Sequence, residues 1–126
     1  NKNNLSKNVK VINFQSNPFS LLKKSNLFIL SSIYEGLPNV LLEALVLKKF
    51  VISSNCPTGP REILSNGKGG ILFKPKNYNQ LSKIIYEYSI KPSRFKSKII
   101  YANKRLNRFD QKVNLKKYLS VVQQFI

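Results

Sequence analysis

The 126-residue sequence contains no histidine and no methionine, one cysteine (Cys56) and five acidic residues. Without histidine, imidazole catalysis and histidine metal ligands are excluded from this chain. A single cysteine likewise excludes an internal disulfide or a cysteine metal cluster. We therefore expect a reducing, cytoplasmic compartment. Because the chain begins with Asn1 and shows no signal peptide, we also expect it to be a piece of a longer protein.

Long apolar runs are also missing, since none approaches the roughly 20 residues that a membrane-spanning helix needs. Phe28–Leu30 and Val40–Leu47 are too short or too interrupted. The hydrophobic fraction of 42% is nevertheless that of a globular protein, which excludes wholesale disorder. The length fits one domain at most.

Negative charge is scarce, because five acids face 22 lysines and arginines and leave a formal net charge of +17 at pH 7. Such a charge attracts phosphate-rich partners such as nucleic acid, anionic lipid or a nucleotide. A compositional bias toward lysine, asparagine and isoleucine would produce the same charge without any function. Both this bias and attraction to an anionic membrane surface stay open, whereas we expect no nucleic-acid partner.

Strand-like and helix-like segments alternate along the chain. The apolar patterns predict strands at residues 9–14, 27–30, 50–53 and 71–73. Helices are predicted after Pro18, over residues 38–48, from Pro60 or Arg61 to Leu64, after an Asn77 cap with Gln80 as in a capping box, after Pro92, and after an Asp110 cap. The helix over residues 38–48 is expected to face the core with Leu41, Leu42, Leu45 and Val46. The last helix is expected to carry an apolar stripe of Val113, Tyr118, Leu119, Val122 and Phe125.

The alternation of strand-like and helix-like segments indicates βαβ crossovers. We therefore predict the α/β class: a Rossmann-like parallel sheet with flanking helices, in a chain that ends in helices. Residues 1–90 would hold the sheet. The helices of residues 91–126 would complete the same domain.

Two loops of this predicted sheet carry unusual residues. In parallel sheets, ligands lie beyond the carboxyl ends of the strands. The loop after Leu30 holds Glu35 and Gly36, and the loop after Ser53 holds Thr58 and Gly59. We therefore expect a binding site at the edge where both loops emerge.

The start of the helix near Pro38 offers an anion-binding site. Its first backbone N–H groups have no partner within the helix, and its dipole is positive at this end. Gly36 has no side chain, so a ligand can approach its backbone closely. These features together suit a phosphate.

Carboxylates flank this phosphate site. Glu35 precedes the helix, and Glu43 lies one turn beyond Asn39 within it. A carboxylate accepts two hydrogen bonds side by side, which suits the vicinal hydroxyls of sugars. A phosphate site between two such acids would describe a nucleotide-sugar pocket. From the residues alone, Glu43 as a solvated helix residue and Glu35 as a partner of the helix dipole remain an equal alternative.

The segment Glu35–Ala44 resembles the E-x7-E signature of retaining glycosyltransferases of family 4 (group 1), which have the GT-B fold. Other segments resemble family landmarks in the family's order: Asn17-Pro18, Ser31-Ser32, Val51–Ser54, Gly59–Leu64 and Gly70–Phe73. The resemblance covers about residues 9–85. It implies that the chain is the C-terminal, donor-binding part of a GT-B fold, with residues 1–90 as a truncated nucleotide-sugar-binding domain.

The resemblance also implies a role for each matching residue. Glu35 would be the catalytic residue and contact hydroxyls of the donor sugar, and Glu43 would hold the ribose hydroxyls. The other donor-binding residues would be Gly36 and Leu37, through backbone N–H groups, and Pro38, Asn39, Thr58 and Gly59 around the pocket. No metal and no cofactor are expected, because helix N–H groups can stabilise the departing diphosphate of a UDP-sugar.

Two features of the family are absent from this chain. The Arg and Lys that grip the diphosphate near the first strand of this half are missing, as is the N-terminal GT-B domain that binds the acceptor. The chain would therefore hold at most half a site, and the isolated fragment is expected to be inactive. The full-length protein would transfer a hexose or N-acetylhexosamine with retention to a glycan or lipid-linked acceptor. The implied setting is bacterial surface polysaccharide or glycoconjugate synthesis, in the cytoplasm or at the inner face of the cell membrane.

The alternative is a non-catalytic basic α/β module that binds an anionic membrane or nucleic acid. Such a module needs basic and aromatic residues on one face. The segment Arg94–Arg108 is basic and includes Phe95 and Tyr101, so it is the candidate surface. A phosphorylase of the same fold is disfavoured, because no lysine stands in a cofactor-attachment setting.

Overall fold

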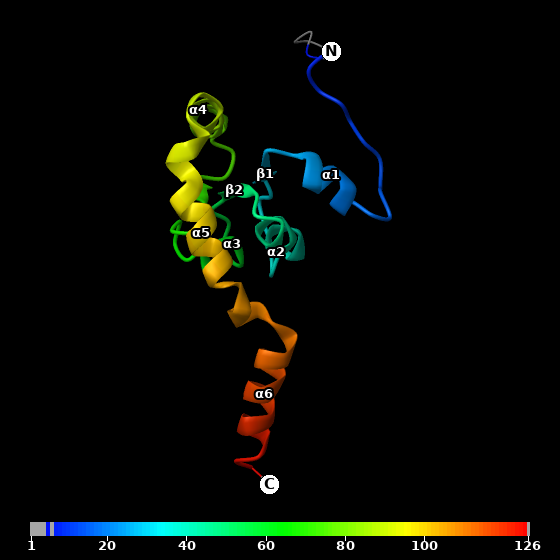
Figure 1. Ribbon diagram of the computed structural model, residues 1–126, viewed down its shortest axis with the longest axis vertical. Coiled ribbons are helices and arrows are strands. Elements are labelled where there is room, and N and C mark those ends of the chain that lie inside the picture. Colours follow the sequence, from blue (N-terminus) through cyan, green and yellow to red (C-terminus); the bar gives the residue numbers. More distant parts are fainter. Residues whose placement is uncertain (1–4, 6, 126) are drawn as a thin grey trace.

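The computed structural model describes residue 5 and residues 7–125. Strands β1 (Leu27–Leu30), β2 (Phe50–Ser54) and β3 (Ile71–Phe73) form a parallel sheet in the order β1-β2-β3. Helices follow each strand and complete the parallel crossovers (Figure 1). The predicted α/β class, a parallel sheet with flanking helices, is confirmed.

Helices make up most of the rest of the described chain. They are α1 (Phe19–Lys24), α2 (Asn39–Val46), α3 (Pro60–Ile63), α4 (Tyr78–Ile90), α5 (Lys96–Lys104) and α6 (Gln111–Val122), with 3-10 turns η1 (Pro92–Phe95) and η2 (Leu106–Phe109). None of the helices within residues 7–125 is long and apolar enough to cross a membrane.

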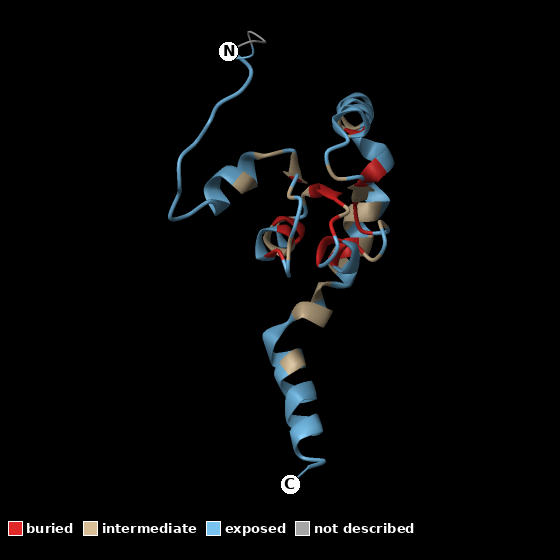
Figure 2. Ribbon diagram, turned by 180° about the vertical axis from the view of Figure 1, so that it is seen from behind, coloured by how far each residue is buried: buried red, intermediate tan, exposed pale blue. Residues whose placement is uncertain are grey.

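The sheet is covered on both faces, and alternate residues of each strand enter different cores. On one face, Val51 packs with α2, α3 and Ala102 of α5. On the other face, Phe50 and Ile52 pack with α4, η1 and the start of α5. Every position of β2 is buried (Figure 2), as expected for the central strand of a parallel sheet.

The predicted strand at residues 9–14 is wrong. This segment has no regular secondary structure and runs away from the sheet (Figure 1), and Val11 and Phe14 are 87% and 93% exposed. An alternating pattern forms a strand only where a neighbouring strand accepts its backbone hydrogen bonds. No described segment pairs with residues 9–14, so the sheet has three strands instead of four.

The core-facing side of α2 also differs from the prediction. Leu41, Ala44 and Leu45 are buried, whereas Val46, which was expected to face the core, is 61% exposed. The three buried residues recur at spacings of three and one, and Val46 lies about 100° further around the helix than Leu45. The helix therefore turns a narrower stripe toward the sheet than its run of leucines and valines indicates.

The predicted apolar stripe of α6 is exposed instead of buried. Its members are all exposed, from 39% for Val113 to 84% for Phe125, and include Tyr118, Leu119 and Val122. The helix extends away from the sheet (Figures 1 and 2). The predicted Asp110 cap is confirmed, since its carboxylate accepts a hydrogen bond of 3.1 Å from Val113 N.

The predicted Asn77 cap of α4 is confirmed. The second hydrogen bond of a capping box, from Asn77 N to the Gln80 side chain, is not formed, because Asn77 N donates to the carbonyl oxygen of Lys74 at 3.0 Å. Asn77 Oδ1 accepts a hydrogen bond of 2.9 Å from Gln80 N. Gln80 Oε1 instead accepts from Lys74 N, at 2.8 Å, and so ties the helix to the chain just after β3.

Replacing Asn77 with alanine is expected to lower the free energy of unfolding by about 1 kcal/mol, because the N–H of Gln80 then loses its only side-chain acceptor within the described chain. Chemical denaturation measures the change. Asn77→Asp, which keeps the acceptor, should be nearly neutral. An equal loss in both variants would contradict a capping role.

Candidate functional site

The loops after β1 and β2 leave the sheet at the same edge. Leu30 and Ser53, near the ends of the two strands, are paired in the parallel register. The Ser54 hydroxyl donates to the carbonyl oxygen of Ser32 at 2.5 Å, and the Thr58 hydroxyl donates to the carbonyl oxygen of Glu35. The structure thus brings together the two loops that the sequence indicated.

Gly59 packs closely against the other loop at Gly36. It is buried, with φ 80° and ψ −72°, a region that residues with a side chain rarely adopt. A β-carbon at this position would fall on the carbonyl oxygen of Gly36 and lie 2.6 Å from Pro38 Cδ. Only glycine therefore allows the 57–59 loop to pack against the start of α2.

Gly36 is in the opposite situation. It is exposed, and a β-carbon there would meet no atom of residue 5 or residues 7–125 within 4 Å. The protein itself therefore does not require glycine at this position. The open space next to its backbone is available to a ligand.

The segment from residue 36 to residue 39, called the 36–39 segment below, leads into α2 with its backbone uncapped. Pro38 is the N-cap residue, in an extended conformation, and no side chain accepts a hydrogen bond from the helix start. Leu37 and Asn39 are exposed, whereas Pro38 is buried against the 57–59 loop. Leu41 N donates to the carbonyl oxygen of Pro38 at 3.0 Å, so the free N–H groups at the start of α2 are those of the exposed residues Asn39 and Val40, at the positive end of the helix dipole.

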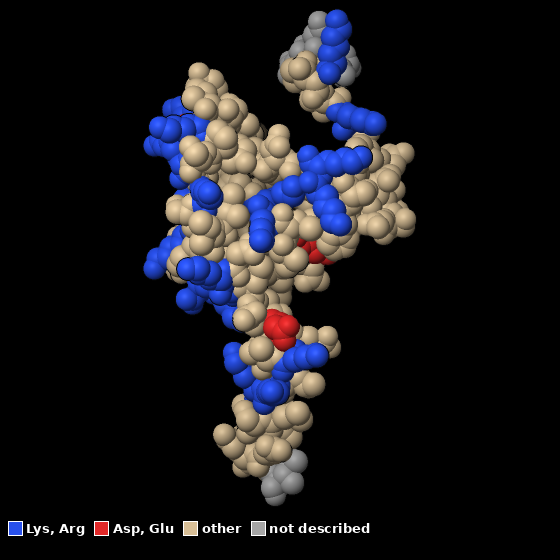
Figure 3. Space-filling model, viewed as in Figure 1, with Lys and Arg blue, Asp and Glu red and all other residues tan. Residues whose placement is uncertain are grey.

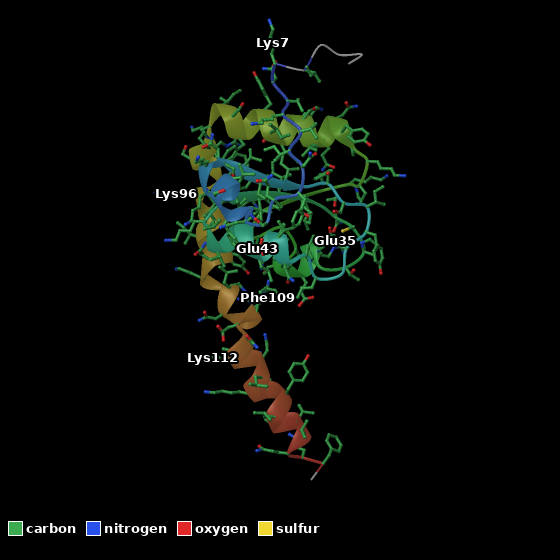
Figure 4. All side chains as sticks on the ribbon, turned by 90° about the vertical axis from the view of Figure 1, so that its right-hand side faces the viewer. Lys7, Glu35, Glu43, Lys96, Phe109 and Lys112 are labelled. Carbon is green, nitrogen blue, oxygen red and sulfur yellow. The ribbon has the colours of Figure 1, made fainter. Side chains whose placement is uncertain are left out.

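Glu35 and Glu43 lie on either side of this segment, and both are half-buried (Figure 4). Glu35 ends the loop after β1, and Glu43 lies one turn into α2 beyond Asn39. At 100° per residue, Asn39 and Glu43 are on the side of α2 opposite the buried Leu41. Two carboxylates and a set of free N–H groups are therefore accessible at one edge of the sheet.

No metal-binding arrangement accompanies them in the described ranges. Residue 5 and residues 7–125 contain no group of three His, Cys, Asp or Glu side chains that could hold a metal ion. Cys56 is buried beneath the 57–59 loop, with its sulfur 3.8 Å from the carbonyl oxygen of Thr58. Its position is that of a core residue.

A second hollow, which the sequence did not indicate, adjoins the 57–59 loop. It has a volume of about 600 Å³, and its walls come from that loop, α3, the turn after α3, the end of α5 and η2. Four of its lining residues are cationic: Arg61, Lys68, Arg105 and Arg108. Arg105 and Arg108 belong to the segment Arg94–Arg108 that the sequence offered as a basic surface. Arg61 and Lys68 were missed because they belong to separate elements, and the available signal was the rarity of arginine in a lysine-rich chain.

The proposed aromatic and basic surface at Arg94–Arg108 is wrong for Phe95. Its side chain is only 6% exposed and packs against Phe50, with ring centroids 4.7 Å apart. Tyr101 is half-buried. Phe95 ends the 3-10 turn η1 and packs into the core, whereas Tyr101 of α5 lines the hollow. The aromatic residues of this segment therefore do not form one surface.

A parallel sheet with two ligand-facing loops at one edge is the architecture of nucleotide-binding α/β domains. The sequence model of the family described as "Glycosyl transferases group 1" matches residues 1–106, so the chain belongs to this family. The resemblance identified from the sequence is thereby confirmed.

Two curated relatives illustrate the match. The chain is 50% identical over 88 residues to an uncharacterized glycosyltransferase of Methanocaldococcus jannaschii, covering 60% of this chain and 22% of the relative. It is 31% identical over 78 residues to the N-acetylgalactosamine-N,N'-diacetylbacillosaminyl-diphospho-undecaprenol 4-alpha-N-acetylgalactosaminyltransferase of Campylobacter jejuni, covering 62% and 21%.

Solved GT-B glycosyltransferases share the fold. TarM matches with a TM-score of 0.83 and 22% identity, over 94% of this chain and 24% of TarM. A glycosyltransferase from Rickettsia africae matches with a TM-score of 0.80 and 27% identity, over 95% and 32%. HepE of Anabaena, solved in complex with UDP, matches with a TM-score of 0.71 and 19% identity, over 84% and 29%. The chain thus spans about a fifth of the length of the two relatives and a quarter to a third of these structures.

Proposed function

We propose that the full-length protein transfers a hexose or N-acetylhexosamine from a UDP-sugar, with retention of anomeric configuration. The acceptor would be a glycan or a lipid-linked saccharide of surface polysaccharide or glycoconjugate synthesis. Family membership supports sugar transfer, and the Campylobacter relative is named for a lipid-linked acceptor that bears a diphosphate. UDP bound to HepE supports the choice of donor.

The observation that carries this proposal is the pair Glu35 and Glu43 beside the uncapped start of α2. In the proposed complex, the diphosphate contacts the free N–H groups of the 36–39 segment. Glu43 accepts hydrogen bonds from the ribose hydroxyls, and Glu35 accepts from hydroxyls of the transferred sugar. Thr58 and Gly59 fix the segment in place through their contacts with Glu35 and Gly36.

The remaining parts of the proposal concern what surrounds this half-site. An N-terminal GT-B domain completes the acceptor side, and the isolated chain has no activity. No metal and no cofactor are needed, because the N–H groups at the start of α2 stabilise the leaving diphosphate. The protein acts in the cytoplasm or at the inner face of the membrane. There α6 could contact anionic lipid through exposed Lys112, Lys116 and Tyr118.

Gly36→Ala in the full-length protein tests where the donor binds. Because a methyl group at Gly36 meets no protein atom within 4 Å, the melting temperature should stay unchanged. The same methyl group would occupy the space through which the donor approaches the backbone, so affinity for UDP should fall about 10-fold or more. Calorimetric titration with UDP measures the affinity.

Gly36→Ser and Gly36→Val extend the series, since larger side chains should weaken UDP binding further while the fold persists. A control at Asn79, an exposed residue of α4 far along the chain from this segment, should change neither quantity when replaced by alanine. Wild-type UDP affinity throughout the Gly36 series would refute donor binding at the 36–39 segment.

A further inference from the structure

The hollow beside the 57–59 loop has the chemistry of an anion-binding site. Its walls carry four cationic side chains and one carboxylate, Glu62. We call Arg61, Lys68, Arg105 and Arg108 with the surfaces between them the arginine groove. At about 600 Å³, it is large enough for more than a single inorganic ion.

Arginine is concentrated here to a degree that the overall composition does not explain. The chain contains four arginines and eighteen lysines, and three of the four arginines line this groove. The lysines, in contrast, are spread along the sequence from residue 2 to residue 117. On the face shown in Figure 3, where lysine and arginine share one colour, basic side chains lie on several separate parts of the molecule. A bias toward lysine accounts for the net charge but not for this grouping. A guanidinium binds phosphate through two parallel N–H groups, which an ammonium cannot do.

Arg108 is held in place before any ligand arrives. Its Nη2 donates to the carbonyl oxygens of Glu62 and Ile63 at 2.6 and 2.8 Å, and its guanidinium carbon lies 4.7 Å from the centroid of the Phe109 ring. Its Nε is buried and finds no acceptor among residue 5 and residues 7–125. A buried N–H without an acceptor is costly, and an anion nearby lowers that cost.

The other two arginines are oriented but keep donors free. Arg61 Nε donates to Asn55 Oδ1 at 3.1 Å, and the guanidinium carbon of Arg105 lies 5.8 Å from the centroid of the Tyr101 ring. Since a guanidinium carries five N–H groups, these contacts leave several available to a ligand. Arranging arginines in advance lowers the entropy that binding would otherwise cost.

The position of the groove indicates which substrate it binds. Thr58 and Gly59 line it, and the same two residues contact Glu35 and Gly36 at the start of α2. In the proposed function the donor's diphosphate already has its own site at the 36–39 segment. A second anion bound beyond the 57–59 loop therefore belongs to the other substrate.

We infer that the arginine groove binds a phosphate group of the acceptor, either a phosphodiester of a polyol-phosphate chain or the diphosphate of a lipid carrier. This inference rests on the proposed function for the identity of the ligand as an acceptor. The anion-binding groove itself rests on the arginines alone, so the two can fail separately.

The test is the double variant Arg61→Gln/Arg105→Gln of the full-length protein. Arg108 is left intact because its contacts with the Glu62 and Ile63 carbonyls also hold η2 against α3. The matched control is Lys83→Gln/Lys96→Gln, which removes the same charge from exposed residues outside the groove; Lys96 is labelled in Figure 4. Binding is measured at fixed salt for UDP, a glycerol-phosphate oligomer, a short-chain prenyl diphosphate and an RNA oligomer.

The expected result is a loss of affinity of about 10-fold or more for one of the two phosphate probes in the groove variant, with little change in the control variant and none for UDP. The probe that loses more identifies the source of the phosphate. Equal losses in the groove and control variants would overturn the inference, as would an RNA oligomer that binds more tightly than both probes. If UDP fails to bind the wild type while the groove variant still loses a phosphate probe, the proposed function fails and the anion site stands.

Discussion

Gly59→Ala is expected to lower the free energy of unfolding by about 3–5 kcal/mol. A side chain at φ 80° costs roughly 1–2 kcal/mol by itself, and the β-carbon would also fall on the Gly36 carbonyl and press on Pro38. Both neighbours are backbone or ring atoms that cannot rotate away. Since domains are stable by only about 5–15 kcal/mol, this substitution alone threatens folding.

Denaturant unfolding of the full-length protein measures this loss. Gly36→Ala is the natural control, because Gly36 lies on the other side of the same contact and a methyl group there meets nothing. If the two variants unfold at the same denaturant concentration, the 57–59 loop does not pack against the start of α2 as described. The pair thus separates a glycine needed by the fold from one whose open space is available to a ligand.

The parallel sheet was predictable because its strands are buried on both sides. The segments 27–30, 50–53 and 71–73 are short apolar runs bounded by polar or glycine-containing loops, and the structure places strands at each of them. Both cores draw on alternate residues of the same strands, so every position must be apolar or small. Local composition therefore carries the information that determines these strands.

The strand predicted at residues 9–14 shows the limit of local patterns. Alternation describes which side chains could face a core, but a strand also needs a partner for its backbone groups, and that partner lies elsewhere in the chain. The same limit explains why Val46 was expected to be buried and is exposed, and why Phe95 was expected at the surface and is buried. Their burial depends on which side of a helix meets the sheet, and the helix sequence alone gives that only approximately.

The candidate site, like the fold, was predictable from the sequence only in part. The order of strands and loops predicted that the loops holding Glu35 and Gly59 would meet, and they do. The exact fit of Gly59 against Gly36 joins residues 23 positions apart, and the arginine groove brings Arg61 to Arg105 and Arg108, which lie 44 and 47 positions further along the chain. Such contacts leave no local periodicity, so the arginine groove became visible only in three dimensions.

Glu35→Gln and Glu43→Gln are expected to reduce sugar transfer by the full-length protein in two distinguishable ways. If Glu43 accepts hydrogen bonds from the ribose, the amide should raise KM for the donor about 10- to 100-fold and leave kcat nearly unchanged, because ribose contacts are the same in the ground and transition states. If Glu35 contacts the transferred sugar, whose charge changes during reaction, its loss should lower kcat by about 100-fold.

Steady-state kinetics with a radiolabelled UDP-sugar separates these two effects. Glu87→Gln, at an exposed acid of α4 on another part of the surface, matches the change in charge and should behave as the wild type. Wild-type rates in both Glu35→Gln and Glu43→Gln would refute the proposed roles. Glu43 would then be a solvated helix residue, and Glu35 a partner of the helix dipole. A rise in KM alone in both variants would keep the donor at this edge of the sheet but remove Glu35 from the chemical step.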